Sequence, residues 1–326
     1  MSFYAGLDIG GTKCAVVLGQ KTGGEIEVLD RQAFATRDYS GPEGALEKCF
    51  ALLDGQLERH GVSREALQGI GVSCGGPLDS VRGLILSPPN LIGWDNVPVV
   101  KMLEKRFGRP AFLQNDANAC ALAEWRYGAG RGTKNMIFIT FGTGCGSGLI
   151  LDGRLYAGTT DMAGECGHMR IASFGPVGYG KAGSMEGFCS GSGIAQLGQT
   201  LALEQLQQGK QTGYCASAEE LSSVTALSVA QAAHAGDETA LEVYRLAGSR
   251  LGLGLSLMID LLNPQAIVIG SIFVRCRDLL LETMNQALER ECLPHSLKAC
   301  AVLPAQLGER LGDIAALTVA EGPGQA

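Results

Sequence analysis

The sequence predicts an α/β protein made of two related lobes, and three observations support this. The chain has 326 residues, a length that favours two lobes over a single domain. It is 46% hydrophobic and only 18% charged, with 47 glycines, which is typical of a compact α/β protein with tight turns. A strand, a glycine turn and a second strand occur twice, and each copy opens one half of the chain.

The first half begins with one of these hairpins. FYAGLDI (3–9) and CAVVLG (14–19) are short apolar runs joined by a glycine turn, which predicts two paired strands. Apolar residues at helical spacing predict a helix over 42–60. The other elements expected here are a strand at 69–76, a helix at 97–107, and a strand from Phe112 that ends before an alanine-rich helix.

The second half begins with NMIFITFGTGCGSGLILDG (135–153), which predicts another strand, turn and strand. A long helix is expected over 237–262, ended by Asn263 and Pro264. The remaining expected elements are a strand at 265–270, a helix at 277–291, a strand at 298–305 and a last helix at 308–322.

Charge and composition argue against several classes of protein. The net charge is −7 and no basic stripe is present, so nucleic acid is not an expected partner. We see no secretion signal and no apolar stretch of about 18 residues, so neither export nor a membrane span is expected. The 11 cysteines are scattered without CxxC spacing, which indicates reduced thiols and a cytoplasmic protein.

The first glycine turn is DIGGTK, from Asp8 to Lys13. Gly10 and Gly11 allow the backbone to approach a ligand closely, Thr12 adds a hydroxyl and Lys13 adds a cation. Such a turn can form an anion-binding nest, although glycine pairs are also common in ordinary hairpin turns.

The second turn, FGTGCGSG (141–148), repeats this pattern around Thr143 and Gly144. It does not have the spacing of a dinucleotide fingerprint, and a strand follows it where that motif requires a helix. Two turns of this kind in one chain favour phosphate binding over coincidence.

Several polar residues are candidates for a site. Asp116 follows a predicted strand, where it can be a helix N-cap or a catalytic carboxylate. Asn115 precedes it and Asn118 follows, and both can be turn residues. Asn90 follows two prolines that stiffen its loop.

Three further candidates lie between residues 165 and 186. Glu165 and His168 are three residues apart and would share a helical face, although a lone His is more often structural. Glu186 lies in a glycine-rich stretch, where a buried carboxylate is costly unless it meets a polar partner.

In this order, the motifs DIGGTK, VSCGGPLD, SPPNLIGW, NDANA, FGTGCGSGLI and ECGH, with a later Glu, resemble those of the ROK family. That family contains bacterial sugar kinases and sugar-responsive repressors. The resemblance covers about residues 4 to 320 and implies a two-lobed actin/hexokinase-like (ribonuclease H-like) ATPase fold with a central cleft. The lobes would be 1–112 with a C-terminal helix at 306–326, and 113–305.

The resemblance implies an ATP- and Mg²⁺-dependent sugar kinase with Asp116 as catalytic base. Sugar contacts are implied for Gly76, Asn90, Asn115, Asp116, Glu165, His168 and Glu186. Nucleotide contacts are implied for Asp8, Gly10, Gly11, Thr12, Lys13, Thr143, Gly144 and Gly270, with Asp8 orienting Mg²⁺ through water. A site of Asn, Asp, Glu and His suits a sugar, because it offers both donors and acceptors to the hydroxyls.

The chain departs from the family pattern in two places. Most members have a zinc site after ExGH, but Gly178 and Ser184 stand at two of its cysteine positions and a third position is missing. Gly and Ser supply no thiolate, so we expect no structural zinc and only a sugar role for His168. Members often have three glycines near 270, where this chain has Gly270 and Ser271.

The expected reaction is phosphorylation of a hexose, by prevalence in the family at the 6-hydroxyl of glucose or a related aldohexose. N-acetylglucosamine, N-acetylmannosamine and fructose are alternative substrates. A non-catalytic sugar-sensing protein of the repressor branch is the alternative from another class. The early position of Asp8, with no room for a helix-turn-helix ahead of it, and the acidic charge argue against it. A homodimer is expected from the family alone.

Overall fold

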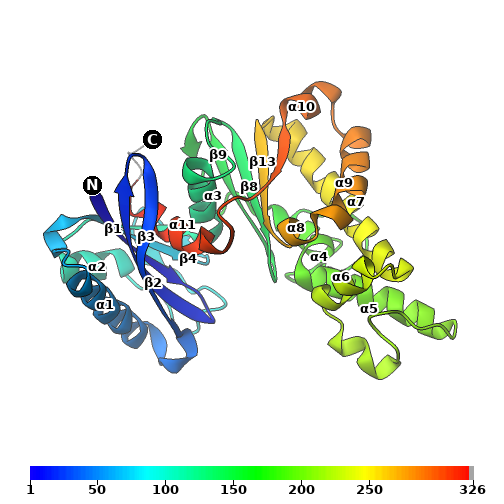
Figure 1. The fold of residues 1–326 in the computed structure, drawn as a ribbon, viewed down its shortest axis with the longest axis horizontal. Helices are drawn as coiled ribbons and strands as arrows, with labels where there is room; N and C mark the ends of the chain where they lie inside the picture. Colours follow the sequence, from blue (N-terminus) through cyan, green and yellow to red (C-terminus); the bar gives the residue numbers. More distant parts are fainter. Residues whose placement is uncertain (323–326) are drawn as a thin grey trace. The chain divides into compact units, whose positions relative to one another are not determined.

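The computed structural model describes residues 1–322 of this chain and confirms the predicted α/β class. It contains two sheets of five strands each, with helices packed on them (Figure 1). No helix within the described part is long and apolar enough to cross a membrane.

The first sheet has the strand order β3-β2-β1-β4-β7. Its strands are β1 Ser2–Ile9, β2 Lys13–Thr22, β3 Glu25–Ala35, β4 Leu67–Cys74 and β7 Ala111–Asn115. β1 and β2 form the predicted antiparallel hairpin, and β1, β4 and β7 are parallel. Ile9 is in register with Cys74, and Cys74 with Asn115, so all three parallel strands end at the same edge.

Helices cover both faces of the first sheet. Ala5, Leu7 and Ile9 point to one face and pack with α1 Gly41–Arg59 and α2 Val99–Phe107. Tyr4 points to the other face and packs with α3 Asp116–Tyr127 and α11 Leu311–Val319. This alternation is the period-two pattern of strands whose two faces are both covered.

The second sheet has the strand order β10-β9-β8-β13-β14. Its strands are β8 Met136–Phe141, β9 Cys145–Leu151, β10 Arg154–Leu155, β13 Ala266–Ser271 and β14 Ala301–Pro304. The helices of this half are α4 Met185–Cys189, α5 Gly191–Gln207, α6 Ala226–His234, α7 Glu238–Leu262, α8 Ile272–Arg275, α9 Arg277–Glu291 and α10 Pro294–Ala299. The expected end of the long helix α7 is confirmed, because Asn263 caps it in a left-handed conformation.

The chain forms two compact units. Unit 1 comprises Met1–Phe138, Gly148–Ala163 and the chain from Gln306, and unit 2 comprises Ile139–Ser147 and Gly164–Ala305. Residues 113–138 therefore belong to unit 1, whereas the sequence analysis assigned them to the second lobe. The reason is that α3 shares a core with α11, through Ala119, Ala123 and Ala316. The division of the chain into two folding domains at residue 112 stays a proposal.

Some elements were not expected from the sequence. β3, α5 and α6 were not predicted, and the predicted last helix is a 3-10 turn Gly308–Arg310 followed by α11. The part of the expected 306–326 helix that covers 323–326 lies outside the described residues.

Candidate functional site

In unit 1, the site begins at the edge where the parallel strands end. Gly10, Gly75 and Asp116 directly follow β1, β4 and β7 in register. A Cβ added to Gly75 would lie 4.0 Å from Oδ2 of Asp116, and one added to Gly76 would lie 3.5 Å from Nδ2 of Asn115. The topology therefore brings together predicted residues that are more than 100 positions apart in the sequence.

Asp116 is not the N-cap of α3, and that reading of the sequence is corrected. Asn115 is the cap, because its side-chain oxygen accepts from the backbone N–H of Ala117 at 3.0 Å and of Asn118 at 3.3 Å. An N-cap oxygen that faces the helix leaves the amide group of Asn115 available as a donor. Because Asn115 caps α3, the helix does not need the Asp116 carboxylate as its cap.

The Asp116 side chain is reachable by solvent, yet the protein atoms around it remove much of its hydration. This desolvation raises the pKa of Asp116, and the backbone N–H groups of Ala117 and Asp116 oppose the rise. Oδ1 accepts from Ala117 N at 2.8 Å. Asp116 is therefore an accessible carboxylate with increased proton affinity, as a general base requires.

Asp8, at the end of β1, is the second carboxylate of this edge. Its pKa is raised to about 6, first by burial and then by the charges of Asp116 and Asp313, against the opposing charges of Lys13 and Arg31. Asp313, which lies on α11 about 300 residues away, was not predicted as a site residue. Its only signal was a carboxylate within the last expected helix, 308–322.

This carboxylate environment fits a divalent cation. Mg²⁺ in kinases is typically held by one or two carboxylates together with substrate phosphates, not by an all-protein cage. Within residues 1–322, no group of three or more His, Cys, Asp or Glu side chains is arranged to hold a metal ion by itself. Asp8 is the residue that would orient a nucleotide-bound Mg²⁺, and that role stays a proposal.

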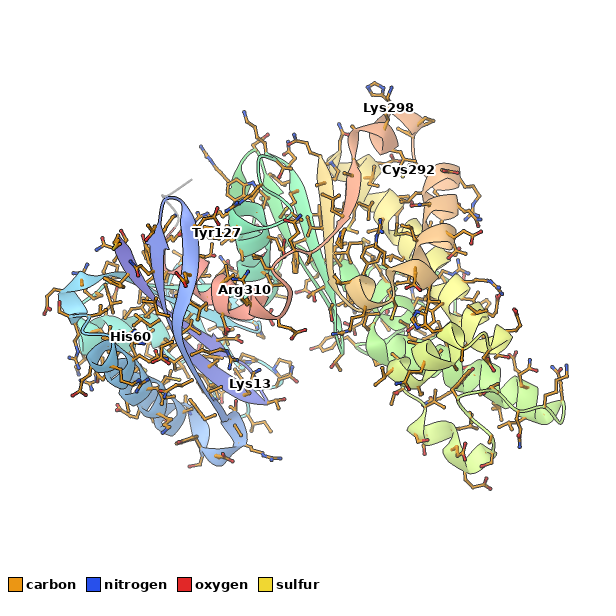
Figure 2. All side chains as sticks on the ribbon, in the orientation of Figure 1. Lys13, His60, Tyr127, Cys292, Lys298 and Arg310 are labelled. Carbon is orange, nitrogen blue, oxygen red and sulfur yellow. The ribbon has the colours of Figure 1, made fainter. Side chains whose placement is uncertain are left out.

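The turn between β1 and β2 is closed by a hydrogen bond from Gly10 N to Lys13 O at 3.1 Å. Lys13, labelled in Figure 2, is the first residue of β2, and its side chain is exposed. Thr36 donates to two carbonyls of the turn, through Oγ1 to Gly10 O at 2.6 Å and through N to Thr12 O at 3.1 Å. A trans peptide points its N–H opposite its carbonyl, so the next amides face away from Thr36. These amides are the donors that a bound anion would meet, and anion binding by the turn stays a proposal.

Asn90 lies directly against the same turn. A Cβ added to Gly11 would overlap the Asn90 carbonyl oxygen and lie 2.8 Å from Asn90 Cβ. Only glycine fits here, and this contact brings the predicted residue Asn90 next to the predicted phosphate turn.

In unit 2, the turn Gly142–Gly144 between β8 and β9 is held in a similar way. Gly191 N donates to Gly142 O at 2.9 Å, and Ser192 Oγ donates to Thr143 O at 3.0 Å. By the same peptide geometry, the amides of Thr143 and Gly144 face away from these donors. Support of this turn by the N-terminus of α5 was not predicted from the sequence.

Glu186 packs against the second turn. Its Oε2 accepts from Cys145 N at 2.9 Å, and a Cβ added to Gly144 would lie 2.9 Å from the same oxygen. The carboxylate is half-buried, and the N–H group of Cys145 is the polar partner that a buried carboxylate needs.

Glu165 and His168 lie at the short 3-10 turn Cys166–His168, and both are exposed. This turn lies beside the second glycine turn, because the sulfurs of Cys145 and Cys166 are 3.9 Å apart. The ring of His168 makes an edge contact with Tyr179, with ring centroids 6.3 Å apart. Exposure leaves both predicted residues accessible to a ligand.

The residues at the family's zinc positions do not fit a zinc ion. Gly178 has no side chain, and Ser184 Oγ already accepts from Gly187 N at 3.1 Å. The nearby thiols are also engaged, since Cys166 faces Cys145 and Cys189 donates to Ala247 O. Zinc needs free thiolate or imidazole ligands in tetrahedral positions, which this segment does not offer.

Gly270 is buried at the end of β13, and Ser271 follows with φ +57 and ψ −117. That region of backbone conformation favours glycine strongly. The next residue, Ile272, has Cδ1 3.4 Å from where a Cβ on Gly191 would stand, and the same position is 3.1 Å from Gly142 O. The Gly270 loop therefore lies near the second glycine turn.

Comparison with known proteins agrees with this arrangement. The model of the ROK family matches residues 4–322. A glucokinase from Halalkalibacterium halodurans is 33% identical over 314 residues, which are 96% of this chain and 93% of that protein. A putative xylose repressor from Caldicellulosiruptor is 28% identical over 282 residues, 86% of this chain and 68% of the repressor.

A solved structure of similar fold supports the same assignment. It is the ROK family glucokinase from Streptomyces griseus in complex with glucose and AMPPNP, with a TM-score of 0.72 and 27% identity. The match covers 98% of this chain and 99% of that protein. The family match over nearly the whole sequence, together with this shared fold, shows that the chain belongs to the ROK family.

Proposed function

We propose that this chain transfers the γ-phosphoryl group of ATP to a hexose, at the 6-hydroxyl of glucose or a related aldohexose. The observation that carries the proposal is Asp116, an accessible carboxylate of raised pKa next to Asp8 and near the glycine turn Gly10–Lys13. The kinase relatives named above support the general class, an ATP-dependent sugar kinase.

In the proposed reaction, the sugar hydroxyl oxygen attacks the γ-phosphorus and its proton passes to Asp116. The bond between the γ-phosphorus and the β–γ bridging oxygen breaks, and ADP leaves. Mg²⁺ bound to the nucleotide supplies charge neutralisation on the phosphates. The protein's part is to orient the hydroxyl and to surround the phosphates with N–H donors.

The sugar contacts follow from donor and acceptor chemistry. In unit 1, the amide of Asn115 and the exposed Asn90 are proposed to bind sugar hydroxyls, with Gly76 leaving room beside Asn115. In unit 2, the sugar roles of Glu165, His168 and Glu186 rest on the family resemblance and stay proposals. The nucleotide roles of Thr143, Gly144 and Gly270 also stay proposals. The homodimeric state and the cytoplasmic location of the protein are proposals as well.

A coupled ADP-release assay with ATP and Mg²⁺ tests the proposal across a panel of sugars. The panel is glucose, mannose, fructose, N-acetylglucosamine and N-acetylmannosamine, and ³¹P NMR of the product identifies the phosphorylated hydroxyl. Fastest turnover of glucose or mannose with a 6-phosphate product is the expected result. Preference for an N-acetylhexosamine or fructose would keep the kinase but change the substrate.

A sugar-sensing function is the second candidate, because a repressor is among the relatives. Isothermal titration with each sugar, with and without ATP, separates the two. Sugar binding without any ADP release from a folded protein would favour the sensor and overturn the kinase proposal.

A further inference from the structure

Between the 3-10 turn at Cys166–His168 and helix α4, the chain makes a short β-hairpin. Its strands are β11 Val177–Gly178 and β12 Lys181–Ala182, paired antiparallel. Tyr179 and Gly180 connect them, both with positive φ, 43° and 74°. Two central residues of positive φ are typical of the type I′ turn, which closes tight hairpins. We name residues 176–184 the 176–184 hairpin.

Backbone hydrogen bonds close this hairpin and tie it to the segment before it. Gly183 N donates to Pro176 O at 3.0 Å, and Gly183 O accepts from Ile171 N at 2.9 Å and from Ala172 N at 3.1 Å. Met185 N donates to Met169 O at 2.9 Å. The segment is thus fixed at both ends by backbone pairing.

The side chains around the hairpin add to this network. Lys181 Nζ donates to His168 O at 2.7 Å, and Arg170 Nη1 donates to Ala182 O at 2.7 Å. The hairpin is therefore also attached to the turn that carries Glu165 and His168.

The hairpin lies directly against Glu186. A Cβ added to Gly178 would be 2.8 Å from both Cβ and Cγ of Glu186 and 2.6 Å from Gly187 N. Contacts this close leave no room for any side chain at position 178, so Gly178 fixes how near the hairpin backbone can approach the Glu186 side chain.

Ser184 holds the same residue from the helix side. It is fully buried, and its Oγ caps α4 by accepting from Gly187 N at 3.1 Å. Glu186 is the second residue of this helix, so the cap sets the direction of its side chain. Its carboxylate then reaches Cys145 N at 2.9 Å.

We propose that the 176–184 hairpin positions Glu186 for sugar binding, with Ser184 and Gly178 as its positioning residues. In this chain, the helix cap at Ser184 and the close backbone packing at Gly178 hold the segment that a bound zinc ion would hold in other members of the family. This inference rests on the proposed function, because it assigns Glu186 to the sugar.

Three variants test the proposal: Ser184→Ala removes the cap, Ser184→Thr keeps a hydroxyl, and Gly178→Ala adds the Cβ. Thr225→Ala is the matched control, because Thr225 Oγ1 caps α6 by accepting from Ser228 N at the same 3.1 Å. For each variant, the KM for sugar, the KM for ATP, kcat and Tm are measured, and glucose binding without ATP is measured by calorimetry.

Ser184→Ala is expected to raise the KM for sugar about threefold to thirtyfold, the range that the loss of a cap spans. The KM for ATP should change less than about twofold, and Ser184→Thr should restore most of the sugar affinity. A loss of fold stability alone would not change the KM for sugar and leave the KM for ATP unchanged. Gly178→Ala should act like Ser184→Ala. Thr225→Ala should lower Tm without changing the KM for sugar.

An unchanged sugar KM in Ser184→Ala and Gly178→Ala, at lowered Tm, would overturn the positioning role. If Ser184→Ala does not fold, Gly178→Ala and Ser184→Thr decide. One zinc ion per chain in the purified wild type, by elemental analysis, would also overturn the inference. If the wild type releases no ADP, the kinase proposal fails, and calorimetry with glucose still tests the positioning. Absence of glucose binding by the wild type would overturn both.

Discussion

The turn Gly10–Lys13 in unit 1 and the turn Gly142–Gly144 in unit 2 connect neighbouring strands, and both direct carbonyl oxygens to protein donors. Thr36 supplies the donors to the first turn, and Gly191 and Ser192 supply them to the second. Both turns therefore present amides on the opposite side, as an anion requires.

The surroundings of the two turns differ. The first lies near Asp8 and Asp116, and Asn90 packs on Gly11. The second turn is supported by the start of α5 and by Glu186, and a Cβ on Gly142 would meet nothing within 4 Å. The two turns therefore share one backbone arrangement and differ in the charge and packing around them. The first turn packs on Asn90 beside the carboxylates of Asp8 and Asp116, whereas the second turn packs on Glu186 at Gly144 and is open at Gly142.

The largest expected effect is on turnover, and it distinguishes Asp116 in unit 1 from Glu186 in unit 2. Asp116→Asn should lower kcat by about 10²- to 10⁴-fold, because the amide cannot accept the proton of the sugar hydroxyl. Glu186→Gln should instead raise the KM for sugar with a smaller loss of kcat. Steady-state kinetics with glucose measures both, and circular dichroism checks the fold. Turnover of Asp116→Asn within tenfold of wild type would exclude Asp116 as the base.

Packing of the two turns is tested by alanine. Gly11→Ala should lower the free energy of unfolding by about 1–3 kcal/mol, because the new Cβ overlaps Asn90. Gly142→Ala should change it by less than about 0.5 kcal/mol, since its position is open. Urea denaturation gives both values. Equal destabilisation by the two variants would contradict the difference in packing between Gly11 and Gly142.

Charge near the first turn is tested by Asp8→Asn. Folding raises the pKa of Asp8 from its ordinary value of 3.8 to about 6, so protonated Asp8 stabilises the fold at low pH. That stabilisation is fully present below about pH 4 and is lost as the pH rises through about 6. Asn mimics the protonated form at every pH, so Asp8→Asn should be more stable than wild type at pH 8, by roughly 1–3 kcal/mol.

The measurement is urea denaturation at pH 4 and pH 8, where the stability difference should disappear at the lower pH. The control is Asp313→Asn, which should give a smaller gain because Asp313 is paired with Arg31 at 2.9 Å. An Asp8→Asn variant that is no more stable than wild type at pH 8 would show that Asp8 is not under electrostatic strain.

The smallest expected effect concerns the loop near the second turn. Ser271→Gly should raise the free energy of unfolding by about 1 kcal/mol, because glycine adopts φ +57 and ψ −117 without steric cost. Among residues 1–322, its hydroxyl accepts a hydrogen bond at 3.3 Å from exposed Arg275, and the loss of this contact is minor. Thermal unfolding measures the change. A lower Tm for Ser271→Gly would mean that the serine side chain contributes more than its backbone costs.

Much of the site could be predicted from the sequence because its parts are local motifs. Each glycine turn is a short segment between strands, and Asn115 and Asp116 stand where a strand meets a helix. The sequence could not show which of these two caps α3, because both side chains can accept N–H groups and only the three-dimensional geometry selects Asn115. Asp313 and Thr36 were missed because they join the site through tertiary contacts alone.

The sequence by itself determined the α/β class, the two glycine turns, the family, and the absence of thiolates at the zinc positions. These depend on residue type and short spacing, which survive without a structure. The tertiary structure alone decided that α3 packs in unit 1, that Asp313 raises the pKa of Asp8, and that a hairpin packs on Glu186. These depend on long-range packing, in which a distance of one or two ångströms changes the outcome and no local pattern specifies it.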